Sequence, residues 1–191
     1  MNKCAFIHVE LSDEIVYNKK LYDIYNVHKM IWELWESCPK TPFLFRLKDN
    51  NLYVLYNKPI DNTNVKWLEN ARITTEKKIN FNGSYSYDII VNPTKRDKKS
   101  KKIIPFKKES NIFRWWEQKG KQSGFEVKIE NTIICNKHNN VSSKEIIIFQ
   151  VYIQGFLKIT NPDLFNEYFI KGFGRAKRFG CGLMLMNKKY S

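Results

Sequence analysis

The sequence predicts an α+β protein made of two tandem ferredoxin-like (β-α-β-β-α-β) domains. Two observations lead to this prediction. Some stretches alternate apolar and polar residues, as strands do, and others show the apolar period of a helix. These stretches follow one another in the order β-α-β-β-α-β, and that order then repeats. The chain also has 191 residues, which is enough for two such units. We expect an N-terminal domain over residues 1–82 and a C-terminal domain over residues 83–191, with the boundary near residues 80–84.

The first predicted unit begins with a strand over residues 4–11, where apolar side chains alternate between two faces. A long helix follows over residues 18–37, and Pro39 ends it. Residues 48–51 (Lys-Asp-Asn-Asn) are typical of a hairpin turn between two strands. The hairpin strands, a short helix and a fourth strand are expected at residues 43–47, 52–56, 62–71 and 72–81.

The second predicted unit repeats this order. Its last helix has a proline near its start, Pro162, and a glycine at its end, Gly172, an asymmetry typical of helices. The four strands are expected at residues 86–92, 125–135, 145–159 and 181–186, and the two helices at residues 109–124 and 161–172.

The net charge favours a polyanionic partner. Lys and Arg total 33 against 19 Asp and Glu, which gives a net charge of +14. A surplus of this size indicates little about fold but favours nucleic acid. The abundance of Lys, Asn and Ile offers a second explanation, a compositional bias of the whole proteome.

Cysteine and histidine are too scattered to predict a metal site. The four cysteines, at positions 4, 38, 135 and 181, form no paired motif, and only three histidines are present. Free thiols, no metal and no cofactor are therefore expected. The N-terminus has no apolar signal region and no stretch is long enough to cross a membrane, so we expect a soluble cytoplasmic protein.

The stretch KGFGRAKRFGCGLMLM (171–186) combines glycines with basic residues. Its glycine spacing fits no dinucleotide fingerprint, it lacks the end of a phosphate loop, and it runs from helix to strand, opposite to both motifs. Glycines can let a backbone lie close to a sugar-phosphate chain, while basic side chains neutralise its charge. The residues predicted to bind RNA here are Gly172, Gly174, Arg175, Lys177 and Arg178. The alternative is a flexible connection with a glycine cap.

A second basic run lies between the first strand and first helix of the second unit. KRDKKSKK (95–102) holds six basic residues in eight. These basic residues are predicted to bind the phosphates of an RNA stem, because A-form RNA is recognised mainly by its shape and its backbone. The alternative is that the run is a solvated loop. These residues are Lys95, Arg96, Lys98, Lys99, Lys101 and Lys102.

Five stretches of this sequence together resemble the CasE family, the CRISPR repeat-processing endoribonucleases of the type I-E Cascade system. The resemblance covers nearly the whole chain in order. Arg178 departs from it, since a small residue is expected there. The stretches are YDIYNVHKMIWELW, NPTKRDKKSKK, WWEQKGKQSGFEV, IQGFLKITNPDLF and GFGRAKRFGCGLMLM.

The first long helix carries the candidate catalytic residues. Ile24, Val27 and Ile31 lie on one apolar stripe, His28 falls at its margin and Tyr25 on the exposed flank. A tyrosine and a histidine at the margin of an apolar stripe more often pack against the core than take part in catalysis. The resemblance implies that Tyr25 and His28 are catalytic. His8, on the first strand, is a weaker candidate, and His138 is expected in a solvated loop.

The resemblance also implies the chemistry. RNA supplies its own nucleophile, the 2′-hydroxyl, so the protein needs only to orient the strand, move protons and stabilise charge. His28 would act as general acid towards the leaving 5′-oxygen, with the role of base as the alternative, and the sequence does not separate the two. Tyr25 would orient the phosphate or share the proton transfer.

The resemblance thus implies an endoribonuclease that binds the stem-loop of CRISPR repeat RNA and cuts at the 3′ base of the stem. It leaves a 2′,3′-cyclic phosphate and a 5′-hydroxyl, keeps the product crRNA and joins other Cascade subunits. The alternatives are a non-catalytic RNA-binding subunit of the same complex and a general binder of nucleic acid.

Overall fold

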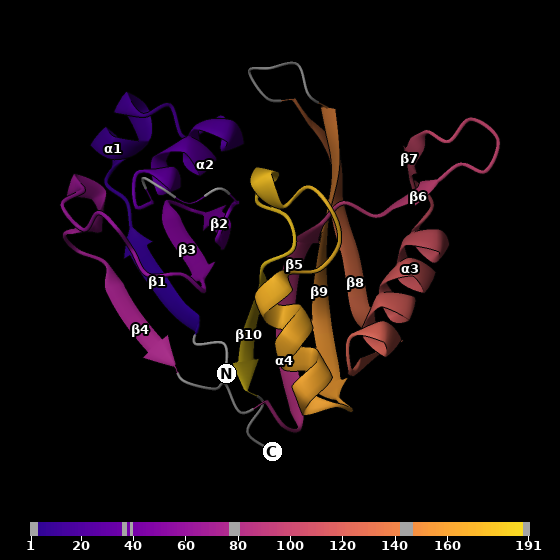
Figure 1. Ribbon diagram of the computed structural model, residues 1–191. Helices are drawn as coiled ribbons and strands as arrows, with labels where there is room; N and C mark the ends of the chain where they lie inside the picture. The colour runs from indigo at the N-terminus through magenta and orange to yellow at the C-terminus, as the bar shows by residue number, and fades with distance from the viewer. Residues whose placement is uncertain (1–3, 36–37, 39, 77–80, 142–146, 189–191) are drawn as a thin grey trace.

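The computed structural model of the protein describes residues 4–35, 38, 40–76, 81–141 and 147–188 (Figure 1). Two four-stranded antiparallel sheets stand next to each other, the first formed before residue 77 and the second after residue 83. The α+β class and the two ferredoxin-like units are confirmed. Part of the predicted boundary near residues 80–84, residue 80, lies outside the described residues.

The N-terminal sheet has the strand order β2-β3-β1-β4, which is the order of a ferredoxin-like unit. Asp49 and Asn50 both have positive φ in the turn between β2 and β3, as a tight hairpin requires. The elements are β1 Cys4–Glu10, α1 Asp13–Asn18, α2 Ile24–Trp32, β2 Phe43–Lys48, β3 Asn51–Tyr56, the 3₁₀ turn η1 Lys66–Leu68 and β4 Arg72–Glu76.

The helix predicted over residues 18–37 is shorter than predicted: α2 covers residues 24–32, and the separate helix α1, at residues 13–18, was not predicted. Lys20 has a positive φ, which breaks the helix after α1. The carboxylate of Asp23 then accepts the N–H of Tyr25 at 2.9 Å and starts α2 as an N-cap. The last part of the predicted range, residues 36–37, lies outside the described residues.

The short helix predicted over residues 62–71 shrinks to the single turn η1. Asn62 accepts the N–H of Asn64 through its side chain at 3.0 Å. Such local side-chain bonds compete with helix formation, which explains the late start.

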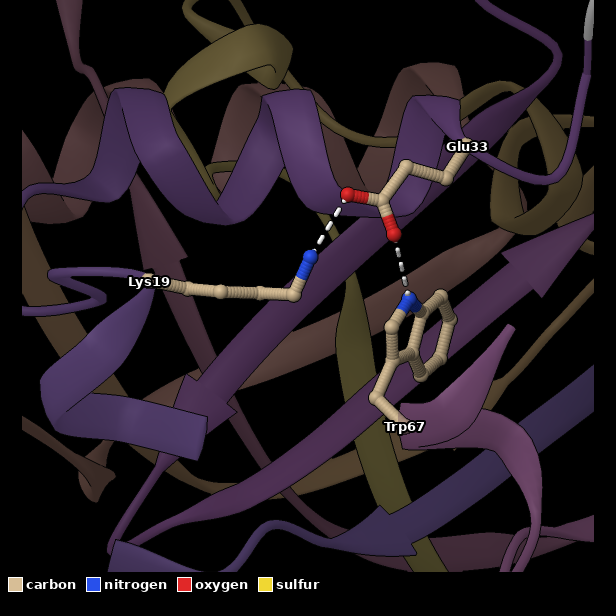
Figure 2. A network of polar contacts seen from close by, with 3 residues as sticks. All are labelled: Lys19, Glu33 and Trp67. Atoms are coloured by element: carbon tan, nitrogen blue, oxygen red, sulfur yellow. Dashed lines mark hydrogen bonds and ion pairs between the residues drawn. The ribbon is translucent and has the colours of Figure 1, made fainter. Parts of the chain in front are cut away.

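Glu33, at the end of α2, links the helix to its neighbours. Its carboxylate pairs with Lys19 Nζ at 2.7 Å and accepts the indole N–H of Trp67 at 3.3 Å, as Figure 2 shows. Trp67 belongs to η1 and is buried. These contacts, together with the N-cap Asp23, fix both ends of the helix that carries Tyr25 and His28.

The C-terminal sheet has the corresponding order β10-β5-β9-β8, with α3 and α4 on one face (Figure 1). A small hairpin, β6 and β7, projects beside α3 and was not predicted. The elements are β5 Ser84–Val91, β6 Thr94–Arg96, β7 Ile103–Pro105, α3 Glu109–Gln122, β8 Phe125–Val141, β9 Ile147–Ile159, α4 Pro162–Lys171, the 3₁₀ turn η2 Lys177–Phe179 and β10 Met184–Lys188.

Aromatic side chains fill the core between this sheet and its helices. Trp116, Phe125 and Phe165 are fully buried, and the indole of Trp116 donates to the hydroxyl of Tyr87 at 2.8 Å. Trp115 is only half-buried and stacks on Trp116. Of this tryptophan pair, Trp116 is thus a core residue and Trp115 reaches the surface.

The N-terminal sheet buries both of its faces. One face packs beneath α2, while Leu44 and Leu55 on the other join the core of the C-terminal domain. Arg46 on β2, also buried, forms an ion pair with Asp88 on β5 and lies over the ring of Tyr152. These contacts hold the two sheets in a fixed relation. In the described part of the chain, no helix is long and apolar enough to cross a membrane.

Candidate RNA-binding and cleavage site

The glycine-rich loop between α4 and β10 is held firmly at both ends. Phe173 and Cys181 are buried, and Phe173 N–H bonds to the carbonyl of Gly182 at 3.0 Å. The side-chain amide of Gln150, on β9, donates to the carbonyl of Phe179 at 2.8 Å. The loop is therefore an ordered structure rather than a flexible connection.

Two glycines of the loop pack against the N-terminal domain. A Cβ on Gly172 would lie 2.7 Å from both methyl carbons of Leu44, and one on Gly180 would lie 3.3 Å from Ile24. Gly172 is buried, so this contact accounts for it without RNA. Gly174, in contrast, lies half-exposed beside Trp115. The loop thus bridges the C-terminal domain to β2 and α2.

Gly172→Ala is expected to disturb this bridge and to lower the thermal stability of the protein. The new methyl group would clash with Leu44, in addition to the strain of a positive φ, which costs about 1–3 kcal/mol. Gly83→Ala is the matched control, because Gly83 also has a positive φ and a Cβ there meets nothing within 4 Å. Thermal unfolding of both variants checks this; equal losses of stability in the two would contradict it.

The three basic residues of the loop differ in their surroundings. Arg175 and Arg178 are exposed at the tip. Lys177 is half-buried and donates to the backbone carbonyl of Lys171 at the end of α4. Burial, and then the charge of Lys171, lower the pKa of Lys177. Arg175 and Arg178 are therefore the loop cations most available to phosphate.

His28 lies deeper than the sequence predicts. Its ring is 7% exposed and packs against Phe43 and Phe45 of β2 and Trp32 of α2, with ring centroids 5.4 to 6.1 Å apart. Its Nε2 is buried and, among the described residues, has no hydrogen-bond partner. Buried polar atoms are nearly always bonded, so an unbonded one calls for an explanation, and a catalytic role is one such explanation.

Arg178 acts electrostatically on His28. Since η2 packs against α2, the C-terminal loop and the N-terminal helix meet at this point. Burial, and then the positive charge of Arg178, lower the pKa of His28 to about 4. At pH 7 the free protein therefore carries a neutral imidazole next to a fixed cation.

Tyr25 lies one turn before His28 on α2 and is half-buried. Its backbone N–H is held by Asp23, so its position at the first turn of the helix is fixed. The predicted i, i+3 spacing on one helix is present, although the helix begins six residues later than predicted.

The basic run 95–102 covers the end of β6 and the turn of the projecting hairpin. Asp97 accepts both the N–H and the hydroxyl of Ser100, at 2.7 and 2.8 Å, and so orders the turn. All six of its basic side chains are exposed, and the ammonium of Lys95 lies over the ring of Phe106.

Two grooves connect this hairpin to His28. The first, of about 380 Å³, runs from Thr94 at the base of the hairpin past Trp115 to Arg175. The second, of similar volume, continues to Phe43 and Arg178, beside His28. Lys171 and Lys177 line both grooves, which makes a continuous basic track.

Two lysines of this track were missed in the sequence. Lys171 directly precedes Gly172, the first glycine of the loop, and this position in the sequence could have marked it as an RNA-binding candidate. Lys119 lies on α3, far from the loop in sequence, and only the packing of α3 brings it to the first groove.

The other histidines lie elsewhere. His8 stacks on Tyr53 and bonds to the side chain of Asn51 at 2.9 Å. The backbone of His138 belongs to β8 and pairs with Gln150, so the predicted loop is wrong there: β8 continues to pair with β9. No group of three His, Cys, Asp or Glu side chains that could hold a metal gathers in the described ranges.

The comparisons with known proteins identify the family. A family model described as CRISPR associated protein matches residues 6–188. The chain therefore belongs to the CRISPR associated protein family, which confirms the resemblance found in the sequence. No curated protein sequence matches the chain significantly.

Solved structures share the fold over nearly the full chain. Thermus thermophilus Cse3, bound to an RNA representing a pre-cleavage complex, superposes with a TM-score of 0.84 at 16% identity, covering 97% of this chain and 100% of that one. Cas6e from Escherichia coli K-12 gives 0.61 at 18% identity, covering 96% and 98%. A chain of E. coli Cascade bound to a double-stranded DNA target gives 0.55 at 17%, covering 95% and 96%. At these identities the likeness shows the fold.

Proposed function

We propose that this protein is a cytoplasmic endoribonuclease that binds the stem-loop of CRISPR repeat RNA, cuts at the 3′ base of the stem and stays with the product crRNA as a subunit of Cascade. One observation carries the proposal: a basic loop from one domain meets, on a helix of the other, a histidine whose buried Nε2 has no hydrogen-bond partner among the described residues. The family membership and the fold shared with Cse3, Cas6e and a Cascade chain support it.

The stem would lie along the basic track. The six cations of the hairpin and Arg175 would bind phosphates, and Gly174 would leave space for the backbone beside Trp115. Recognition of a stem through shape and phosphates needs such a distributed set of cations. The track then leads the strand toward Arg178 and His28.

His28 is assigned the role of general base. With a pKa of about 4, only about one molecule in a thousand holds a protonated ring at pH 7, so the ring is ready to accept a proton. It would take the proton of the 2′-hydroxyl while the 2′-oxygen bonds to phosphorus. The bond from phosphorus to the 5′-oxygen then breaks, which leaves a 2′,3′-cyclic phosphate. The 5′-oxygen takes a proton from water to become a 5′-hydroxyl, and His28 gives its proton to the hydroxide that remains.

Arg178 and Tyr25 would support this step. The guanidinium of Arg178 would stabilise the charge that develops on the phosphoryl oxygens, as fixed cations do in such transition states. Tyr25 would orient the scissile phosphate from the first turn of α2. None of these roles requires a metal ion.

Cleavage is expected to persist in EDTA and to stop when the nucleotide 5′ of the scissile phosphate is 2′-deoxy. The reason is that the deoxy sugar lacks the nucleophile while the binding surface is unchanged. Repeat RNA and its single-deoxy version, incubated with the protein and resolved by size and end group, test this. Cutting of the deoxy substrate or a strict need for magnesium would refute the mechanism.

The burial of His28 also favours a second candidate, a non-catalytic RNA-binding subunit in which this ring only packs between Phe43 and Phe45. The two candidates differ in one observable. Incubation of the wild-type protein with its repeat RNA yields cut product in the first case and bound, intact RNA in the second.

A further inference from the structure

The face of the C-terminal sheet opposite α3 and α4 carries an exposed aromatic ring. Along β9, Ile153 and Leu157 point into the core with the helices, and because side chains alternate, Phe156 points to the other side. Its side chain is 44% exposed although β9 is an inner strand of the sheet. Part of this residue is therefore accessible from the side of the sheet that faces away from the helices.

Phe156 lines a groove of about 680 Å³, larger than either groove beside the glycine-rich loop. Three lysines surround it: Lys158 two residues further along β9, Lys128 on β8 and Lys188 at the end of β10. One acid, Glu126, also lines the groove, opposite Lys158 in register. The charged residues that line the groove therefore have a net positive charge.

Amide side chains complete the lining. Asn82 and Asn131 both border the groove, and each offers a donor and an acceptor. An aromatic floor, amides that can bond base edges and a rim of lysines for phosphate match the needs of a nucleotide in a single strand. Unpaired bases stack on aromatic side chains of open sheets, whereas paired bases in a stem cannot.

We propose that this groove binds single-stranded RNA, with one base stacked on Phe156. The groove lies away from the cleavage site: Gln150 holds the glycine-rich loop, and Phe156 is six residues further along β9, about 20 Å away at strand geometry. Its lining residues are all different from those of the basic track. The inference rests on the proposed function only in taking the natural ligand to be RNA.

The test is binding of a labelled eight-nucleotide RNA without self-complementarity, followed by fluorescence anisotropy at low salt. Phe156→Ala should weaken binding by about 5- to 150-fold, the loss for one stacked base. Phe156→Tyr keeps the ring and should bind like the wild type. Phe156→Leu keeps apolar bulk without a π face and should be as weak as the alanine variant.

Hairpin cleavage by the same variants separates this inference from the proposed function. It should proceed at the wild-type rate in all three, which also shows that they fold. The inference is overturned if the wild type does not bind the single strand, if Phe156→Ala binds it equally well, or if Phe156→Leu matches the wild type; the last two outcomes would assign the ring to an apolar protein contact. As a second readout, an oligonucleotide carrying 5-iodouridine should photo-crosslink to the β9 peptide that contains Phe156, and a crosslink confined to other peptides would contradict stacking there.

Discussion

Replacing His28 by Ala is expected to slow cleavage of a repeat hairpin by at least about 10²-fold, the usual scale for a positioned general base. Hairpin affinity should stay within a few-fold of the wild type, because the cations that would bind phosphates lie on other elements, the β6–β7 hairpin and the glycine-rich loop. Single-turnover rates and binding constants on one hairpin measure both quantities.

The burial of His28 requires a control for packing. Its ring fills space between Trp32, Phe43 and Phe45, so the alanine variant also leaves a cavity. Met30→Ala makes a comparable cavity on the same helix without removing an imidazole, since Met30 is buried in the same core. We expect Met30→Ala to lower stability and to cleave at nearly the wild-type rate below its unfolding temperature.

Tyr25→Phe is expected to have a smaller effect than His28→Ala, because it removes one hydroxyl and leaves the base in place. Cleavage by His28→Ala at the wild-type rate would remove the catalytic assignment, and His8 would be the next residue to test. Joint loss of folding and binding in that variant would instead favour the non-catalytic candidate.

The order of the helices and strands along the chain and most of their positions were predictable because they depend on local pattern. Alternation along β1 and β9 and the turn at Asp49 and Asn50 are properties of neighbouring residues. The break between α1 and α2 was missed because no glycine or proline marks it; a lysine, Lys20, takes the unusual φ. The β6–β7 hairpin was missed because each of its strands has only three residues, and because the basic residues of β6 and of the turn resemble a solvated loop.

The site was only partly accessible to sequence reasoning. Residue types and helical spacing place Tyr25 and His28 next to each other on one helix. Only the family resemblance marks them as catalytic residues. The depth of His28 depends on Phe43 and Phe45, which belong to another strand. The neighbour that sets its electrostatics, Arg178, lies 150 residues further along the chain, and no local pattern connects the two.

Arg178→Ala is expected to slow cleavage by about 10²- to 10³-fold, the loss typical of removing one fixed group that stabilises transition-state charge. Arg175→Ala is the matched control, because Arg175 is an exposed cation of the same loop beside the first groove and not the second. It should weaken binding and reduce its salt dependence by about one phosphate contact, with little change in the cleavage rate of bound RNA.

The pH dependence gives a second, independent readout of Arg178. In the wild type the charge of Arg178 adds to burial in lowering the pKa of His28 to about 4. A general base loses activity when it is protonated, so the rate at subsaturating protein should fall only as the pH drops toward 4. Without the arginine the pKa should rise, and the fall should begin at a higher pH; because burial is the larger cause and remains, it should still begin below the ordinary value of 6.5. Arg178→Lys keeps the charge and should retain the wild-type profile. An acidic limb that does not move in Arg178→Ala, together with an unchanged rate, would show that this arginine acts on neither the phosphate nor His28.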